Sequence, residues 1–157
     1  MDFKFLINDL QTAKHLQKRI GTDKGLAKIG DSIVNLTYSM AKSLYLSENT
    51  PNKNPHRTGK KVSKRILAEA LKNADLKHFA KNRADAHDLA DTAESLIAYT
   101  WISQNLTIKQ IIEVLYKCLE GSLVKRIEER KNAIVSFTRL LLYLKRFLPG
   151  DSESKSE

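Results

Sequence analysis

The 157-residue sequence has little cysteine, proline or glycine, and no long apolar run. Its single cysteine, Cys118, can form neither an intramolecular disulfide nor a cysteine zinc site, so we expect a reduced, cytoplasmic setting. No stretch reaches the ~18 uncharged apolar residues that a transmembrane helix needs. The N-terminus lacks a basic start followed by a long apolar segment, so we also expect no signal peptide.

The six glycines and three prolines fall mostly between segments in which apolar residues recur with helical spacing. No segment shows strand-like alternation, and no internal repeat is present. The sequence therefore predicts an all-α, single-domain bundle of about seven helices. The predicted helical segments are 3–20, 23–46, 62–73, 75–83, 86–103, 107–120 and 122–148.

Capping and loop signals support these boundaries. Asp23 is a candidate N-cap, and Thr107 with Gln110 has capping-box spacing. Residues 47–60 carry two prolines, three asparagines and one glycine, which is typical of a loop. Pro149 ends the last helix, and we expect residues 150–157 to form a disordered acidic tail beyond a domain that spans residues 1–149.

Acidic residues are also in short supply: 18 of them face 27 lysines and arginines, for a net charge of +9. The last eight residues hold three acids and one base, so the rest of the chain carries +11. Such an excess attracts polyanions, although a lysine-rich solvated surface has the same composition. The positive charge is densest from Lys53 to Arg65, where six basic residues and no acidic residue occur.

Three acidic residues lie in apolar helical segments that are expected to be buried, where charged residues are rare. Asp31 is the only charged residue in the thirteen residues 29–41, and Asp91 and Glu94 are the only ones in the fourteen residues 89–102. Burying a lone carboxylate costs several kcal/mol unless it is paired or binds a metal. Asp91 and Glu94 are three residues apart and so share one helical face.

Three carboxylates on two buried helices could form an oxygen-ligand site for Mg²⁺ or Mn²⁺. The alternative is that each is salt-bridged, for example Asp31 to Lys28. His87 shares the face of Asp91 and Glu94 and could support the acids or contact phosphate, or it could be structural. Asn35, one turn after Asp31, could orient that carboxylate or make a plain helix–helix hydrogen bond.

Both acid-bearing segments resemble the ribonuclease III family. Residues 26–33, LAKIGDSI, resemble its signature helix, usually Glu-Phe-Leu-Gly-Asp, and are closer to the Leu-Ala-Tyr-Ile-Gly-Asp of its compact Mini-III branch. Residues 91–99, DTAESLIAY, resemble its Asp-x-x-Glu-Ala-Leu-x-x-Ala helix, and residues 64–69, KRILAE, its middle helix. The resemblance covers residues 22–105. The sequence shows no resemblance to a double-stranded-RNA-binding domain, which is typical of Mini-III-like or archaeal variants.

The resemblance implies a ribonuclease III endonuclease-domain fold and a homodimer that cleaves double-stranded or structured RNA with Mg²⁺ or Mn²⁺. Products would carry 5′-phosphate and 3′-hydroxyl ends. Asp31, Asp91 and Glu94 would be the catalytic metal ligands. RNA phosphates would contact the basic segment, through Lys60, Lys61, Lys64 and Arg65, unless it is a solvated loop.

Three positions depart from the family pattern, and one of them is Lys28, which stands in place of the aromatic residue that packs at the family's dimer interface. Ala27 stands in place of the family's first glutamate, and Lys24 in place of another acidic residue. The Mini-III-like motif lacks the same glutamate. The alternative function is therefore a catalytically inactive relative that binds RNA within a larger ribonucleoprotein. Residues 23–46 carry apolar residues on two sides, which predicts that the surplus face forms a two-fold interface.

Overall fold

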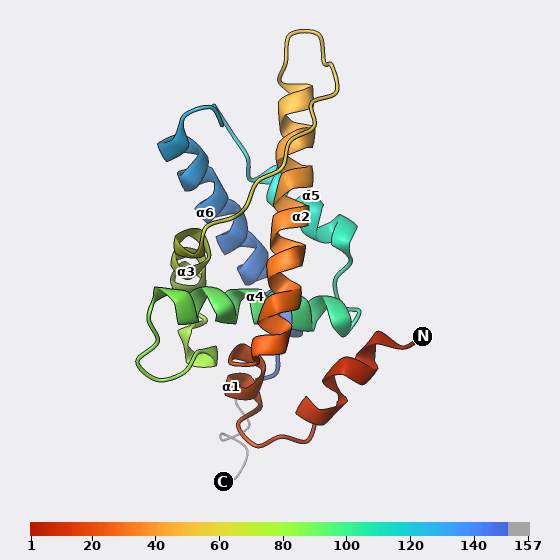
Figure 1. Ribbon diagram of the computed structural model, residues 1–157, viewed down its shortest axis with the longest axis vertical. Helices are drawn as coiled ribbons and strands as arrows, with labels where there is room; N and C mark the ends of the chain where they lie inside the picture. Colours follow the sequence, from red (N-terminus) through yellow and green to blue (C-terminus); the bar gives the residue numbers. More distant parts are fainter. Residues whose placement is uncertain (151–157) are drawn as a thin grey trace.

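The computed structural model describes residues 1–150, and within them the chain is helical with no strand, which confirms the predicted all-α fold (Figure 1). Six α-helices carry the architecture, with three 3-10 helices (η) beside them. In chain order the elements are η1 (Phe3–Leu10), α1 (Leu16–Gly21), α2 (Lys24–Glu48), α3 (Lys64–Asn73), η2 (Lys77–Phe79), α4 (Ala86–Ile102), α5 (Ile108–Lys117), α6 (Arg126–Leu144) and η3 (Lys145–Phe147).

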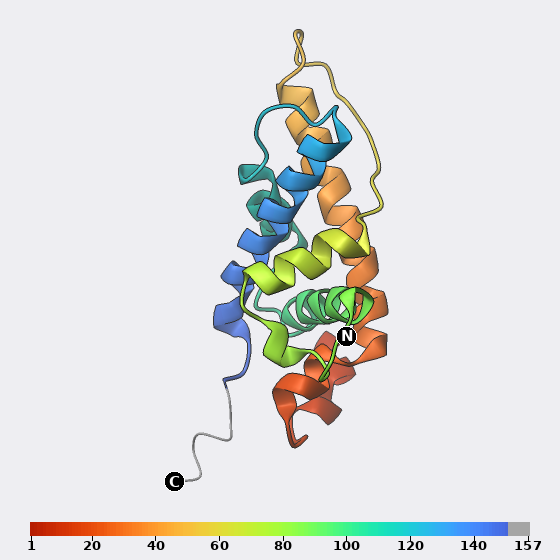
Figure 2. The same cartoon turned by 90° about the vertical axis from the view of Figure 1, so that its left-hand side faces the viewer.

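Helix α4 forms the centre of the molecule. Residues 89–100 are all buried, and the helix contacts α1, α2, α3 and α6. Figure 2 shows α4 end-on, with α2 on one side and α6 on the other. A helix that is apolar all round is a core helix, which explains why its sequence has almost no charge. The two charges within residues 89–100, Asp91 and Glu94, are therefore buried as well.

Helices α2 and α4 cross in very close contact, and Gly30 makes this possible. A Cβ atom built on Gly30 would lie 2.0 Å from the carbonyl oxygen of Glu94, which no side chain could tolerate. Glycine is the residue that allows two backbones to approach so closely. The crossing brings Asp31, the next residue of α2, close to Glu94 of α4.

Residues 56–62, which include the end of the predicted loop and the predicted start of the next helix at residue 62, form an extended segment bound along α2. Four polar side chains spaced four residues apart on α2 pair with alternate backbone amides of the segment. Four helical residues rise about 6 Å and two extended residues about 6.6 Å, so the two periods match. In each pair the backbone amide donates to the side-chain oxygen: Val62 N to Asn35 (2.8 Å), Lys60 N to Ser39 (2.8 Å), Thr58 N to Ser43 (3.0 Å) and His56 N to Ser47 (2.8 Å).

The predicted capping signals are confirmed. Asp23 accepts a hydrogen bond from Leu26 N at 2.8 Å at the start of α2. The capping box of Thr107 and Gln110 is complete at the start of α5. The side chains that cap these helices satisfy amides that have no partner within the helix.

Some predicted boundaries are wrong. The single helix predicted for residues 3–20 is divided into η1 and α1, because His15 takes a left-handed backbone conformation with φ 56°. The helix predicted for residues 75–83 is reduced to η2, and the one predicted from residue 122 begins at Arg126. Of the predicted acidic tail, residues 151–157 lie outside the described residues. None of the helices in residues 1–150 has the length and apolar character needed to cross a membrane.

Candidate active site

The three predicted acids line one hollow. Its volume is about 320 Å³, and it lies between α2, the start of α3 and α4. Asp31 comes from α2, and Asp91 and Glu94 come from consecutive turns of α4. The hollow is also lined by Ala27 and by basic residues, namely Lys24, Lys28, Lys61, Lys64 and His87. The sequence prediction that these acids converge is therefore consistent with the geometry.

Lys64, which the sequence analysis predicted to bind RNA, lies between the carboxylates of Asp91 and Glu94. The Lys64 ammonium lies 2.8 Å from Glu94 Oε2 and 3.1 Å from Asp91 Oδ1. Lys24 binds the other oxygen of Asp91, at 2.8 Å from Oδ2. In this arrangement Lys64 neutralises the acids and is not available to an RNA phosphate.

Glu94 is the most constrained of the three acids. Its side chain is 1% exposed, and Oε1 is buried with no hydrogen-bond partner among the described residues. Burial raises the pKa of Glu94 to about 7, against the opposing effect of Lys64 and with a further rise from the charges of Asp31 and Asp91. Near neutral pH this carboxyl group is therefore only partly ionised, although it faces an ammonium.

Asp91 behaves in the opposite way. Burial favours its neutral form, but hydrogen bonds from Lys24 and Lys64 outweigh that effect and lower its pKa. His87 Nδ1 lies 3.4 Å from Asp91 Oδ2, and the histidine side chain is 67% exposed. The two acids of α4 therefore differ in charge state because one is bound by two lysines and the other is deeply buried.

Asp31 is half-buried at the edge of the hollow. Asn35 donates a hydrogen bond to its Oδ1 at 3.3 Å, so Asn35 both contacts this carboxylate and anchors Val62. The ion pair with Lys28 that the sequence offered as an alternative does not form within residues 1–150. Asp31 is thus the acid whose charge is least compensated.

Within residues 1–150, no group of three or more His, Cys, Asp and Glu side chains is arranged so that it could hold a metal ion. At the two acids of α4, the Lys64 ammonium binds one oxygen of each, Asp91 Oδ1 and Glu94 Oε2, where a shared cation would bind. The donor chemistry nevertheless fits a hard divalent cation: carboxylates are the ligands of Mg²⁺ and Mn²⁺, and Glu94 Oε1 is a buried oxygen without a partner.

The four predicted RNA-binding residues do not form one surface. Lys61 and Arg65 are exposed, and only Lys61 lines the acid hollow together with Lys64. Lys60 lies on the other side of the extended segment, where its ammonium is 3.8 Å from Glu129 of α6. The segment is therefore ordered and positively charged, with Lys61 on the side of the acid hollow and Lys60 on the side of α6.

A comparison with protein-family models matches the Ribonuclease III model to residues 24–148, which is most of the chain. The chain belongs to the ribonuclease III family. Members of this family are endoribonucleases, enzymes that cleave RNA, and they generally use a divalent metal. A comparison with curated proteins finds no match. The matched residues include all three acids of the hollow, so the site lies within the ribonuclease III domain.

All three departures from the ribonuclease III pattern, Lys24, Ala27 and Lys28, line this hollow. Ala27 is 5% exposed and lines it, so a carboxylate of the family's first glutamate would have entered it here. Lys24, at another position that is acidic in the family, donates its ammonium to Asp91. This chain has therefore lost negative charge and gained positive charge at the same place.

The sequence analysis missed the role of Glu129. Glu129 lies among the alternating charges of residues 125–131, which resemble a salt-bridged helix surface, but it is 7% exposed, and Lys42 of α2 binds it at 2.8 Å. A signal was present: Glu129 precedes Ala133 and Phe137 at intervals of four residues, on the buried side of α6. A glutamate in register with a core stripe is expected to be buried and paired.

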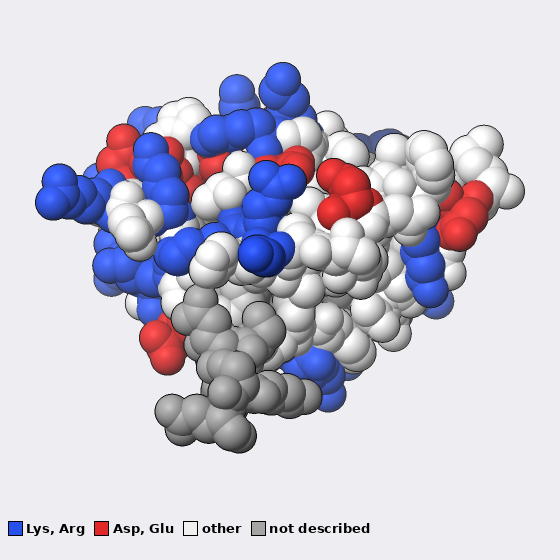
Figure 3. All heavy atoms as spheres, turned by 90° about the horizontal axis from the view of Figure 1, so that it is seen from below, with Lys and Arg blue, Asp and Glu red and all other residues white. Residues whose placement is uncertain are grey.

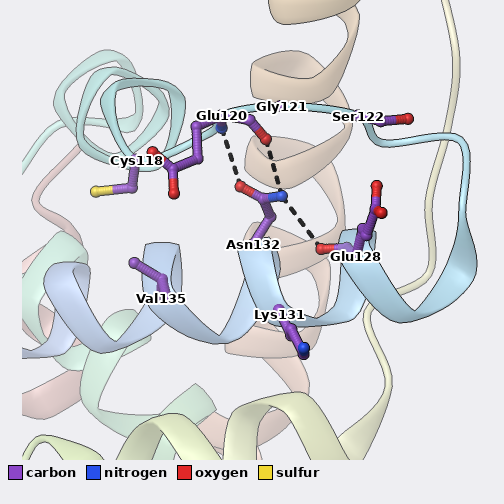
Figure 4. Close-up of a pocket in the computed structure, with 8 residues that line it drawn as sticks. All are labelled: Cys118, Glu120, Gly121, Ser122, Glu128, Lys131, Asn132 and Val135. Atoms are coloured by element: carbon purple, nitrogen blue, oxygen red, sulfur yellow. Dashed lines mark hydrogen bonds between the residues drawn. The ribbon is translucent and has the colours of Figure 1, made fainter.

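A second hollow, of about 370 Å³, lies between the end of α5 and α6 and shares no residue with the acid hollow (Figure 4). Its wall is fixed by Asn132, whose side chain accepts from Glu120 N at 2.9 Å and donates to the carbonyls of Glu120 and Glu128. These bonds hold the turn before α6. The hollow brings together no acids comparable to those of α4, so the acid hollow is the candidate active site.

Proposed function

We propose that the chain is a divalent-metal-dependent endoribonuclease that cleaves double-stranded or structured RNA and leaves 5′-phosphate and 3′-hydroxyl ends. The observation that carries the proposal is the convergence of three carboxylates on one hollow, one of them with a buried oxygen that has no partner. Burial of this kind is costly, and a metal-binding role is a reason to retain it.

In this proposal Asp31, Asp91 and Glu94 hold the metal, Mg²⁺ or Mn²⁺. The bound metal would supply activation of water and neutralisation of charge on the leaving oxygen. The chain's own residues have other tasks. Lys61 at the rim attracts the phosphate backbone, and Asn35 holds the carboxylate of Asp31 in place. Lys64 must leave the acids before a cation can bind there, and it is then free to face a phosphate.

The positive surface supports an RNA substrate. Figure 3 shows lysine and arginine side chains gathered on one side of the molecule, the side on which α3 and the start of α4 lie in Figure 1. Such a field steers a polyanion toward the protein and makes its binding depend on salt. The acid hollow opens between these same two helices and α2.

Cleavage of a duplex RNA tests this function. We expect the purified protein to cut the duplex in Mg²⁺ or Mn²⁺ and not in EDTA, because in this proposal the three carboxylates act through the cation that they hold. The ends of the products are checked by their acceptance of a 5′-phosphate-dependent ligase. The contradicting outcome is a protein that binds the duplex but leaves it intact with either cation.

That outcome would support the second candidate, a catalytically inactive relative that binds RNA in a larger ribonucleoprotein. A specific observation favours it: Lys64 and Lys24 already compensate Asp91 and Glu94 with no metal, while Ala27 removes the family's first ligand. Permanently compensated acids would be structural. The cleavage assay separates the two candidates because only the enzyme needs the cation.

We further propose that two copies assemble through α2. Leu36, Met40 and Leu44 follow one another at helical spacing and are 53%, 44% and 45% exposed. A stripe of this kind on a two-fold axis would pack against its own copy and place two acid hollows in one particle. Two symmetric sites could cut the two strands of a duplex.

Replacing Met40 with glutamate should convert a dimer into a monomer, because two copies of the new charge would meet at the interface. Light scattering at micromolar concentration measures this. The matched control is Leu142→Glu on α6, a residue of similar exposure at 43%. A parent protein that is already monomeric, or a control that dissociates equally, would contradict the proposed interface.

A further inference from the structure

A smaller and strongly basic hollow lies on the opposite side of the extended segment from the acid hollow. Its volume is about 140 Å³, and residues 60–63, the first turn of α3 and the first turns of α6 line it. Four basic side chains surround it: Lys60 and Lys61 from the segment, and Arg126 and Arg130 from α6. Neither arginine belongs to the acid hollow.

The charge of this hollow is not cancelled by its one acid. Glu129 lies in its wall, but the ammonium of Lys42, which is 14% exposed, binds Glu129 Oε1 from the interior at 2.8 Å. Tyr38 donates a further hydrogen bond to the same oxygen at 3.4 Å. Burial and the Glu129 charge raise the pKa of Tyr38, so the phenol remains a donor.

The basic groups that remain are therefore available to a ligand. Lys60 is within 3.8 Å of Glu129, while Lys61, Arg126 and Arg130 form no ion pair with any described residue. The backbone adds to the field, since α3 and α6 both begin at this hollow and helix starts carry partial positive charge. The N-cap of α6, Lys125, contributes no side-chain hydrogen bond, so the first amides of α6 are not capped by it.

The two hollows are neighbours, because Lys61 lines both. A strand whose scissile phosphate lies at the acids would run along the extended segment and carry another phosphate toward Arg126 and Arg130. Arginine is the side chain best suited to bind a phosphate with two parallel hydrogen bonds.

We propose that the hollow formed by Lys60, Lys61, Arg126 and Arg130 binds a backbone phosphate of the RNA, beside the strand position that is cleaved. The inference rests on the proposed RNA substrate and does not depend on metal or on catalysis. It gives the first turns of α6 a role in substrate binding.

The test compares two double variants of α6 that remove the same charge. Arg126→Ala with Arg130→Ala empties the hollow, and Lys125→Ala with Lys131→Ala removes two exposed lysines that do not line it. Binding of a fluorescent duplex RNA is measured by anisotropy in EDTA over a range of salt concentrations. All four side chains are exposed, and circular dichroism melts check that each variant is folded.

We expect the arginine variant to bind several-fold more weakly and its slope of log affinity against log salt to fall by about 1, the effect of one lost phosphate contact. The lysine variant should keep the slope of the parent. Equal behaviour of the two variants would overturn the phosphate site, and so would an unchanged slope in the arginine variant. A parent that binds the duplex with this difference but never cuts it would overturn the enzymatic function and leave the phosphate site standing.

Discussion

Glu94→Gln should reduce cleavage of duplex RNA at least about 100-fold, the size of effect expected when a group that stabilises transition-state charge is removed. The same variant should make the metal-free protein more stable at pH 8. Burial has raised the pKa of Glu94 to about 7, above its usual value, so ionising it costs more in the folded chain than in the unfolded one. Glutamine removes that cost, which is about 1–3 kcal/mol after screening by solvent.

The raised pKa of Glu94 also determines how the stability of the fold depends on pH. Because the folded pKa is raised, the parent loses stability as pH rises from the usual glutamate value through about 7. The difference between Glu94→Gln and the parent should therefore be large at pH 8 and small near pH 5, where Glu94 is protonated. Thermal melts at the two pH values measure it. A variant that melts far below the parent at pH 8 would instead assign Glu94 a structural ion pair with Lys64.

Variants of the other two acids should both lose activity but should differ in the stability of the fold. Asp31→Asn should abolish cleavage and leave the fold as stable or more stable, since Asp31 has no ion pair among residues 1–150 and its charge raises the pKa of Glu94. Asp91→Asn should abolish cleavage but destabilise the protein, because Lys24 and Lys64 lower the pKa of Asp91. That stability is present above the usual aspartate pKa and is lost as pH falls through the lowered value.

Lys64→Met should strengthen metal binding about tenfold and weaken the metal-free fold. The Lys64 ammonium occupies the space between Asp91 Oδ1 and Glu94 Oε2, so a cation must displace it. Lys64 is 40% exposed, and a partly exposed pair of this kind contributes about 1 kcal/mol, close to the ~1.4 kcal/mol that corresponds to tenfold in affinity. Without the lysine, two neighbouring carboxylates repel one another until a cation binds.

Mn²⁺ titration followed by calorimetry, together with thermal melts, measures both effects. Lys72→Met is the matched control, because Lys72 lies on the same helix α3 and pairs with Glu69 at the surface at 2.9 Å. The control should leave Mn²⁺ affinity unchanged. If Lys64→Met and Lys72→Met behave alike, Lys64 does not compete with the metal, and the position of its ammonium has no bearing on the site.

The sequence predicted the helical fold and the convergence of the acids because both depend on local patterns. The three acids could be placed together because they are the only charged residues in the stretches 29–41 and 89–102, and Gly30 marks a close crossing of the two helices. Helix starts were predicted where a side chain caps them, as at Asp23 and Thr107. The N-terminal helix was predicted too long because apolar spacing does not show that His15 takes a left-handed conformation.

The ion pairs of the site could not be predicted in the same way. Lys64 lies 27 and 30 residues from its partners and Lys24 lies 67 from Asp91, and a long, flexible lysine can reach many acids at such separations. Only the tertiary packing determines which acid each lysine pairs with. The sequence predicts an ordinary loop after α2, although the four-residue spacing of Asn35, Ser39 and the two serines that follow indicates a row of polar side chains that can bind an extended segment. The sequence does not predict the basic hollow beside α6, because Arg126 and Arg130 are interspersed with Glu128 and Glu129 in the sequence.

The central claim is that Asp31, Asp91 and Glu94 bind a divalent cation together, and direct Mn²⁺ binding tests it most closely. Calorimetric titration at pH 8, where Glu94 is largely ionised, should show one Mn²⁺ site per chain in the parent. Asp31→Asn should weaken that site strongly, with a melting temperature that no longer rises on adding Mn²⁺. A parent that binds no Mn²⁺ at pH 8, alone or with duplex RNA present, would contradict the claim and leave the three acids as the lysine-compensated core of an RNA-binding relative.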